Sequence, residues 1–239
     1  MVKYMKEAIK MAHEYDILLD QKAHNLFSIA YKNLAGARRA SWRVLSAEKN
    51  KYEGKESWKQ EIIESHLAEV EKELCDICVE AIDIINKCIL TKDDVKNNKE
   101  SNIFFLKMKG DYYRYKAEVE RDDALKKSTE EAQRSYDEAY KEAMVLPTTS
   151  PVRLGLALNF SVFYYEILKK HDEACKLAKS SFDDAIAELE HLSEDHYKDS
   201  TLIMQLLRDN LTLWTSPPDK TQDDPEYEDE ETKNPEDNE

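Results

Sequence analysis

The chain has 239 residues, of which 41% are hydrophobic, and its 50 acidic and 35 basic side chains give a formal net charge of −15. An acidic balance of this size argues against a general binder of nucleic acids or anionic membranes. The four cysteines are too few for a disulfide scaffold, and no secretory leader or membrane-spanning run is evident. We therefore expect a cytoplasmic protein that also has access to the nucleus, with a core of its own and no cofactor.

Residues that break secondary structure are rare. Only four glycines and six prolines are present, and four of the prolines, from Pro217 onward, lie near the end of the chain. Apolar residues recur at intervals of three and four, and strand-like alternation is not evident. The sequence therefore predicts an all-α fold.

The predicted helices follow one another with short loops between them. Asp20 is a plausible N-cap for the second helix, and Ser193 begins a capping box before the last one. Loops are expected at 49–56, at 93–100 and around Pro147 and Pro151. The eight predicted helices cover about 3–16, 20–47, 57–90, 101–121, 123–144, 153–168, 171–192 and the segment from 196 to 215.

The last residues differ from the rest in composition. Residues 216–239 contain eleven acids, two lysines, four prolines and a single aromatic residue, so they carry a net charge of −9 and leave −6 for the remainder. Such a segment cannot bury enough apolar surface to offset the entropy of ordering. We expect a helical domain at 1–215 and a disordered acidic tail at 216–239.

A basic stripe stands out in this acidic chain. Lys32 and Arg39 are seven residues apart on a predicted helix, so two turns bring them to one face, with Gly36 between them. This arrangement suits an anion site, although the same spacing is typical of a solvated helix face. The spacing alone leaves both interpretations open.

Three further rows share helix faces. Lys107, Asp111, Arg114 and Tyr115 are spaced i, i+4, i+7 and i+8, which also fits an exposed face with salt bridges. Two mixed rows, each usual at the boundary of a core, suit a groove wall; they consist of Leu158, Asn159, Val162 and Glu166, and of Leu202, Leu206, Asn210 and Trp214.

The pair Cys75 and Cys78 has the spacing of a metal or redox motif. It lies within a helical run, with no second pair and no histidine at ligand spacing. We expect buried helical thiols and no metal.

Four blocks taken together, residues 31–44, 109–115, 153–166 and 199–214, closely resemble the 14-3-3 family over residues 5–215. The resemblance implies an antiparallel helical bundle shaped as an open cup and usually paired into a homo- or heterodimer. It also implies an adaptor, not an enzyme, whose amphipathic groove holds phosphoserine or phosphothreonine peptides of client proteins in signalling.

The resemblance assigns roles by motif position. Lys32, Arg39, Arg114 and Tyr115 would bind the phosphate, and Lys107 would lie close by. The peptide would be held by Asn159 and Asn210 on its main chain, by Glu166 and Trp214 upstream of the phosphate, and by an apolar wall of Leu158, Val162, Leu202, Ile203 and Leu206. Ser41 matches a family serine whose phosphorylation disfavours dimers.

Several positions depart from the family pattern. The sequence starts after the usual first helix, Tyr4 replaces a usual acid, Glu69 replaces a usual base, and Glu73 lacks its usual partner. We therefore expect a weakened or differently packed dimer. We also expect the acidic tail to compete weakly for the basic groove.

Two other function classes remain as alternatives. The runner-up is a helical scaffold or chaperone-like protein that binds unphosphorylated or apolar clients. An enzyme is disfavoured, because the six scattered histidines, and the lack of a glycine-rich phosphate loop or a Ser-His-Asp arrangement, leave no nucleophile or base to assign.

Overall fold

The computed structural model describes residues 1–52, 57–191 and 194–216. Within these ranges it contains no strand, which confirms the all-α prediction. A π-helical turn, Ile85–Ile89, extends α3, and a 3₁₀ turn, Leu189–His191, follows α8. The α-helices are α1 (Val2–Glu14), α2 (Gln21–Tyr52), α3 (Ser57–Ile84), α4 (Asp93–Asn97), α5 (Lys99–Val119), α6 (Asp122–Ala143), α7 (Pro151–Glu166), α8 (His171–Ala187) and α9 (Glu194–Thr215).

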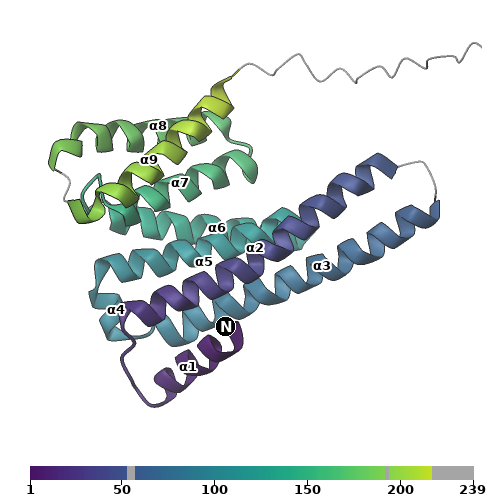
Figure 1. Cartoon of the computed structure of the whole chain (residues 1–239), viewed down its shortest axis with the longest axis horizontal. Coiled ribbons are helices and arrows are strands. Elements are labelled where there is room, and N and C mark those ends of the chain that lie inside the picture. Colours follow the sequence, from purple (N-terminus) through teal and green to yellow (C-terminus); the bar gives the residue numbers. More distant parts are fainter. Residues whose placement is uncertain (53–56, 192–193, 217–239) are drawn as a thin grey trace, which may run out of the picture.

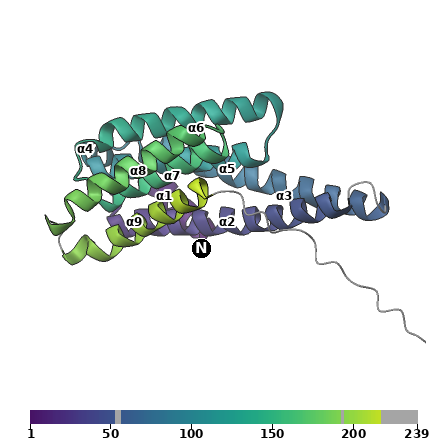
Figure 2. The ribbon, with the colours of Figure 1, turned by 90° about the horizontal axis from the view of Figure 1, so that it is seen from above.

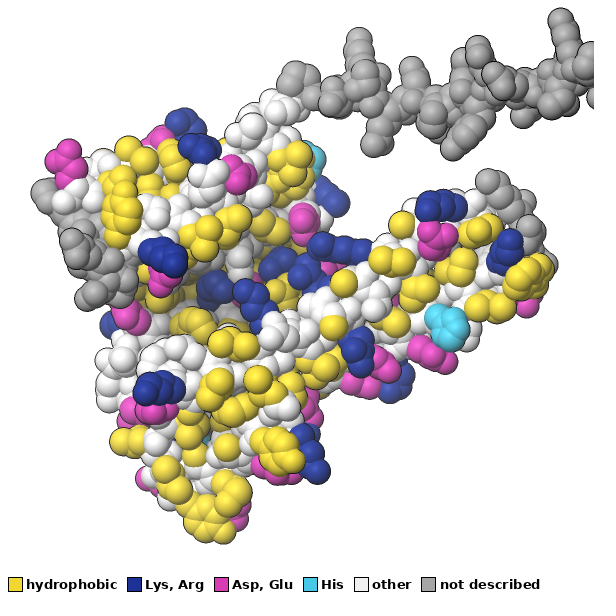
Figure 3. Space-filling model, in the orientation of Figure 1, with side chains coloured by type: hydrophobic (Ala, Val, Ile, Leu, Met, Phe, Trp, Pro, Cys, Tyr) yellow, Lys and Arg dark blue, Asp and Glu magenta, His cyan; other side chains and the backbone are white. Residues whose placement is uncertain are grey.

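The helices stack in sequence order. The long helices α2 and α3 form a hairpin whose far end projects beyond the rest of the molecule (Figures 1 and 2). Helix α5 packs on α3 and α6, and α7 packs on α6, α8 and α9. Because α2 and α9 lie on opposite sides of α5 and α7, a hollow remains between them (Figure 3). This is the open cup that the family resemblance implies.

Three buried clusters hold these layers together. Tyr31, Leu74 and Ile85 belong to the first cluster, between α1, α2, α3 and α5. Further along the chain, Phe160 lies in the cluster that joins α5, α6 and α7, and Leu207 in the one that joins α7, α8 and α9. Each fully buried side chain of this size contributes about 1.5–3 kcal/mol. The floor of the hollow is therefore built on packed core.

The helix boundaries refine the sequence predictions. Asp20 caps α2 as predicted, since its Oδ1 accepts a hydrogen bond of 2.8 Å from the backbone N–H of Ala23. The predicted start of the first loop, at residue 49, is wrong, because α2 continues to Tyr52. The predicted break at 93–100 contains α4, where Val95 is buried, and Asn98 then caps α5.

Two of the sequence predictions lie outside the described residues. One is the start of the capping box at Ser193, and the other is the acidic tail from residue 217 onward.

The cysteines are all free thiols. Cys78 is buried as predicted, and Cys75 is partly buried. Burial raises the pKa of the Cys75 thiol to about 11. A thiol with so high a pKa is a poor nucleophile near neutral pH. Among the described helices, none has the length and apolar character needed to cross a bilayer.

Candidate functional site

The two arginines of the predicted phosphate site meet at one tyrosine ring. The guanidinium carbon of Arg39, on α2, lies 4.0 Å from the centre of the Tyr115 ring, and that of Arg114, on α5, lies 4.8 Å from it. Lys32 lies on the same side of α2 as Arg39, two turns away. It is exposed and lines a cavity together with Tyr115. The structure therefore brings together the four residues that the family resemblance assigned to the phosphate.

Glu118 binds both arginines and was not predicted from the sequence. Arg39 donates to it through Nε and Nη2, at 2.7 and 2.6 Å, in a bidentate pair. Arg114 donates to the same carboxylate through Nη1 at 3.4 Å. The one signal in the sequence is that Glu118 follows Arg114 by four residues, one helical turn. One carboxylate thus contacts the guanidiniums of both arginines.

Asp111 is the acceptor at the centre of the site. Lys107 Nζ donates to its Oδ2 at 2.8 Å, and the Nδ2 amide of Asn159 contacts both of its oxygens at 2.8 and 3.0 Å. Tyr136 Oη donates to Oδ1 at 2.5 Å, and Arg114 Nη2 lies 3.5 Å from the same atom. Asp111 thus connects α5 to α6 and α7.

This network is buried, unlike the exposed face that was one alternative for the row on α5. Asp111, Arg114 and Tyr115 have only 7%, 5% and 8% of their surface exposed. Burial opposes the charged form of Asp111, but Lys107 and Arg114 outweigh it and lower the pKa of this carboxyl below its ordinary value. Burial, followed by the charge of Asp111, raises the pKa of Tyr115, so its hydroxyl stays protonated.

The charges of the site do not cancel. Lys32, Lys107, Arg39 and Arg114 supply four positive charges, and the two carboxylates of Asp111 and Glu118 supply two negative ones. Lys32 has no ion-pair partner within the described ranges, so one cation at the mouth of the site is free. Such a cluster favours a dianion.

A cavity of about 130 Å³ opens onto this cluster. Gly155 on α7 lies between α5 and α9, because a Cβ at this position would lie 3.9 Å from both Lys107 Cε and Ile203 Cδ1. The charged floor and the α9 wall are therefore neighbours. The residues that line the cavity are Ser28, Lys32, Phe104, Lys107, Met108, Asp111, Tyr112, Tyr115 and Asn159.

The predicted apolar wall lies along α7 and α9. Leu202 and Leu206 are 60% and 44% exposed, and both lie on α9 four residues apart, so they share one face of that helix. The other wall positions, Leu158, Val162 and Ile203, are partly buried. In the space-filling view, Lys and Arg side chains gather in the hollow. Hydrophobic side chains lie above it, on the part of the molecule that contains α8 and α9 (Figure 3).

The remaining predicted ligand contacts lie further from the charge cluster. The Trp214 ring stacks on Tyr165, with centroids 4.6 Å apart and planes 9° apart. Within the described ranges, neither Glu166 nor Asn210 makes a side-chain hydrogen bond or ion pair, so both side chains have free polar atoms.

The positions linked to pairing are exposed. Ser41 is at the surface of α2, where its hydroxyl donates to the Ala37 carbonyl at 3.1 Å, and Tyr4 is 73% exposed. Glu73 accepts a hydrogen bond of 2.5 Å from Arg38 of its own chain. Glu69 lies 3.5 Å from His66.

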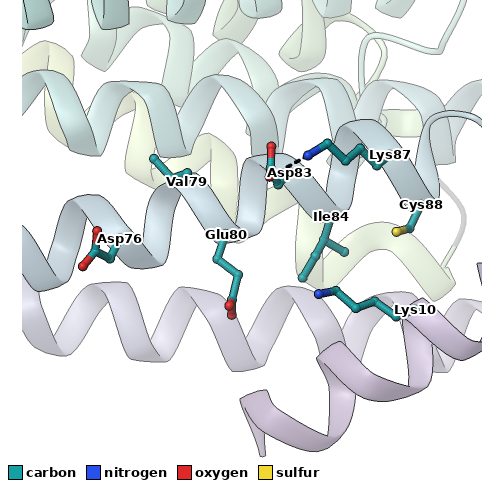
Figure 4. A pocket seen from close by; sticks show the side chains of 8 residues that line it. All are labelled: Lys10, Asp76, Val79, Glu80, Asp83, Ile84, Lys87 and Cys88. Carbon is teal, nitrogen blue, oxygen red and sulfur yellow. Dashed lines mark hydrogen bonds and ion pairs between the residues drawn. The ribbon is translucent and has the colours of Figure 1, made fainter.

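A second hollow, of about 310 Å³, lies between α1 and α3 (Figure 4). Its carboxylates already have partners: Glu80 pairs with Lys6 and accepts from Tyr31 at 2.6 Å, and Asp83 pairs with Lys87 at 2.8 Å. Because acids and their partners fill this lining, it is less suited to an anion than the cluster at Arg39 and Arg114.

Sequence comparison relates the chain to known proteins. A sequence model of the family described as "14-3-3 protein" matches residues 1–215. The chain is 54% identical to "14-3-3 protein homolog" of Encephalitozoon cuniculi (strain GB-M1) over 216 residues, which cover 90% of this chain and 84% of that protein. It is 57% identical to "14-3-3 protein homolog 2" of Schistosoma mansoni over 199 residues, covering 83% and 91%. It is 52% identical to "14-3-3 protein zeta" of Bombyx mori over 223 residues, covering 92% and 88%.

Proposed function

The chain belongs to the 14-3-3 family, and from this premise we propose that it is a cytoplasmic adaptor that binds phosphoserine or phosphothreonine segments of client proteins. The segment would lie in the hollow between α2, α5 and α9. Binding breaks no covalent bond and uses no cofactor in this proposal.

One observation carries the proposal: two guanidinium groups from different helices contact one tyrosine ring, inside a cluster with a surplus of two positive charges. A phosphoserine carries about −1.5 to −2 charges and three acceptor oxygens near neutral pH. Planar guanidiniums match such a group with charge-assisted hydrogen bonds. Lys32 and the protonated hydroxyl of Tyr115 are two further donors within the same cluster.

The same charges explain discrimination against an unmodified client. A serine hydroxyl cannot neutralise the surplus positive charge, so the cations would be desolvated without a partner. At roughly 1.5–3 kcal/mol per hydrogen bond to a charged group, each lost bond weakens binding by tenfold or more.

The peptide main chain has an acceptor ready beside the phosphate. Asn159 directs its Nδ2 at Asp111, so its carbonyl oxygen is left to accept from a main-chain N–H of the client. The exposed leucines of α9, Leu202 and Leu206, would then cover apolar side chains of the segment.

A fluorescence-polarisation titration with one labelled peptide, phosphorylated and unphosphorylated, tests this proposal. We expect the phosphorylated peptide to bind at least tenfold more tightly. Equal binding of the two forms would contradict it and favour the alternative, a scaffold that binds apolar clients through the α9 wall.

We also propose that this chain pairs as a homo- or heterodimer, and that the pairing is weakened. Family membership supports a dimer in general. The exposed Tyr4 and the intrachain pairing of Glu73 with Arg38 both reduce the charges available to a partner subunit. Light scattering over a dilution series should show a monomer at nanomolar concentration; a dimer mass that persists there would contradict the weakening.

A further inference from the structure

Tyr136 lies directly beneath the phosphate site, although nothing in the family assignment above gave it a role. It comes from α6, has 0% of its surface exposed, and reaches α5 at the level of Gly110 and Asp111. Its sequence neighbours, Ser135 and Asp137, resemble those of any tyrosine on an amphipathic helix, so the sequence carries no signal for it.

The ring of Tyr136 is closely packed. Phe160 stacks on it, with centroids 5.3 Å apart and planes 19° apart, and Phe163 lies 5.4 Å away. In addition, a Cβ added to Gly110 would lie 2.9 Å from the ring, which is closer than real Cβ contacts allow. The hydroxyl of Tyr136 therefore has a set position.

That position lies between an anion and a cation of the site. Tyr136 Oη donates to Asp111 Oδ1 at 2.5 Å and accepts from Arg114 Nε at 3.2 Å. Arg114 then has a partner at each of its three nitrogens, since Nη1 faces Glu118 and Nη2 faces Asp111.

The count of donors shows what this contact achieves. A guanidinium has five N–H groups, and three of those of Arg114 are engaged, so one remains on each terminal nitrogen. One N–H group on each terminal nitrogen can bind two oxygens of one phosphate. Without the Nε contact, only the two longer contacts, 3.4 Å to Glu118 and 3.5 Å to Asp111, would hold the guanidinium.

We propose that Tyr136 is the positioning residue for Arg114: its hydroxyl holds the guanidinium so that the two free N–H groups face the phosphate of a client. This inference rests on the proposed function, because it concerns the same site.

The test uses Tyr136→Phe in the full chain, with Tyr140→Phe as the matched control. Tyr140 lies one turn along α6 and also packs on Phe160, at 6.0 Å, but within the described residues its hydroxyl has no hydrogen-bond partner. Titration with a phosphoserine peptide should give a dissociation constant about tenfold higher for Tyr136→Phe and unchanged for Tyr140→Phe.

A double-mutant cycle separates positioning from a general loss of structure. In an Arg114→Lys background, Tyr136→Phe should cause no further loss, because lysine has no Nε–H to hold. In addition, the Nε–H signal of Arg114 in nuclear magnetic resonance spectra should exchange slowly with water in the wild type and fast in Tyr136→Phe.

The outcomes are distinguishable. If the wild type prefers the phosphorylated peptide and Tyr136→Phe binds it equally well, or if the two substitutions are additive, the positioning role is overturned and the proposed function stands. A wild type that does not prefer the phosphorylated peptide overturns the proposed function, and the positioning role with it.

Discussion

Replacing Gly110 with alanine tests how tightly α5 and α6 are joined beneath the site. The new Cβ would lie 2.9 and 3.0 Å from Cε1 and Cδ1 of Tyr136, a ring that Phe160 and Phe163 also pack against. Overpacking costs about 1–3 kcal/mol, and a contact below 3 Å with the atoms of a packed ring belongs in the upper part of that range, about 2–3 kcal/mol, whereas alanine in a helix gains about 1 kcal/mol over glycine. We expect a net loss of about 1–2 kcal/mol in the free energy of unfolding.

Thermal unfolding followed by circular dichroism measures this loss. For a domain of this size, about 1 kcal/mol corresponds to about 2–4 °C in Tm, so Gly110→Ala should unfold about 2–8 °C lower. Gly36→Ala is the matched control, because a Cβ at Gly36 has no atom within 4 Å and alanine should stabilise α2 there. If both substitutions raise Tm by the same amount, the close contact between Gly110 and Tyr136 is refuted.

Three further predictions concern the charges of the molecule. Arg39→Lys should raise the dissociation constant for a phosphopeptide about tenfold, since lysine cannot keep the bidentate pair with Glu118. The control Arg38→Lys changes the neighbouring arginine, which pairs with Glu73, and should leave the dissociation constant unchanged. Calorimetric titration measures both. Burial lowers the pKa of His24 below its ordinary 6.5, so its contribution to stability is full above that pH and is lost as the pH falls. His24→Gln should therefore flatten the decline in Tm between about pH 7 and 5, which thermal unfolding at a series of pH values measures. The lowered pKa of Asp111 gives stability that is present above about pH 4 and is lost on further acidification. Asp111→Asn should therefore unfold at a lower denaturant concentration than the wild type at neutral pH, and the difference should shrink in acid.

Much of the fold could be predicted from the sequence, because its signals are local. Periodic apolar residues and few breakers are sufficient to place eight long helices, and a capping residue such as Asp20 marks the start of one. Boundaries that depend on tertiary contacts were missed. Helix α4 exists because Val95 finds a buried position, and α2 continues past 49 where Lys49 pairs with Glu64 of α3.

The candidate site divides in the same way. Lys32, Arg39 and Arg114 could be assigned to the candidate site from motif positions, since that assignment depends on residue type and spacing. Glu118 and Tyr136 could not, because their contacts depend on which helices become neighbours. Asp111 was placed on the correct face of its helix, but only the packing of α6 and α7 against that face makes it a buried acceptor for Asn159 and Tyr136.

A crystal structure of this protein with a bound phosphoserine peptide would show where the phosphate lies. We expect phosphate oxygens within hydrogen-bond distance of the terminal nitrogens of Arg39 and Arg114, with Lys32 alongside and the peptide following the α9 wall. A phosphate bound elsewhere, for example in the hollow between α1 and α3, with the two arginines still paired only to Glu118 and Asp111, would contradict this expectation.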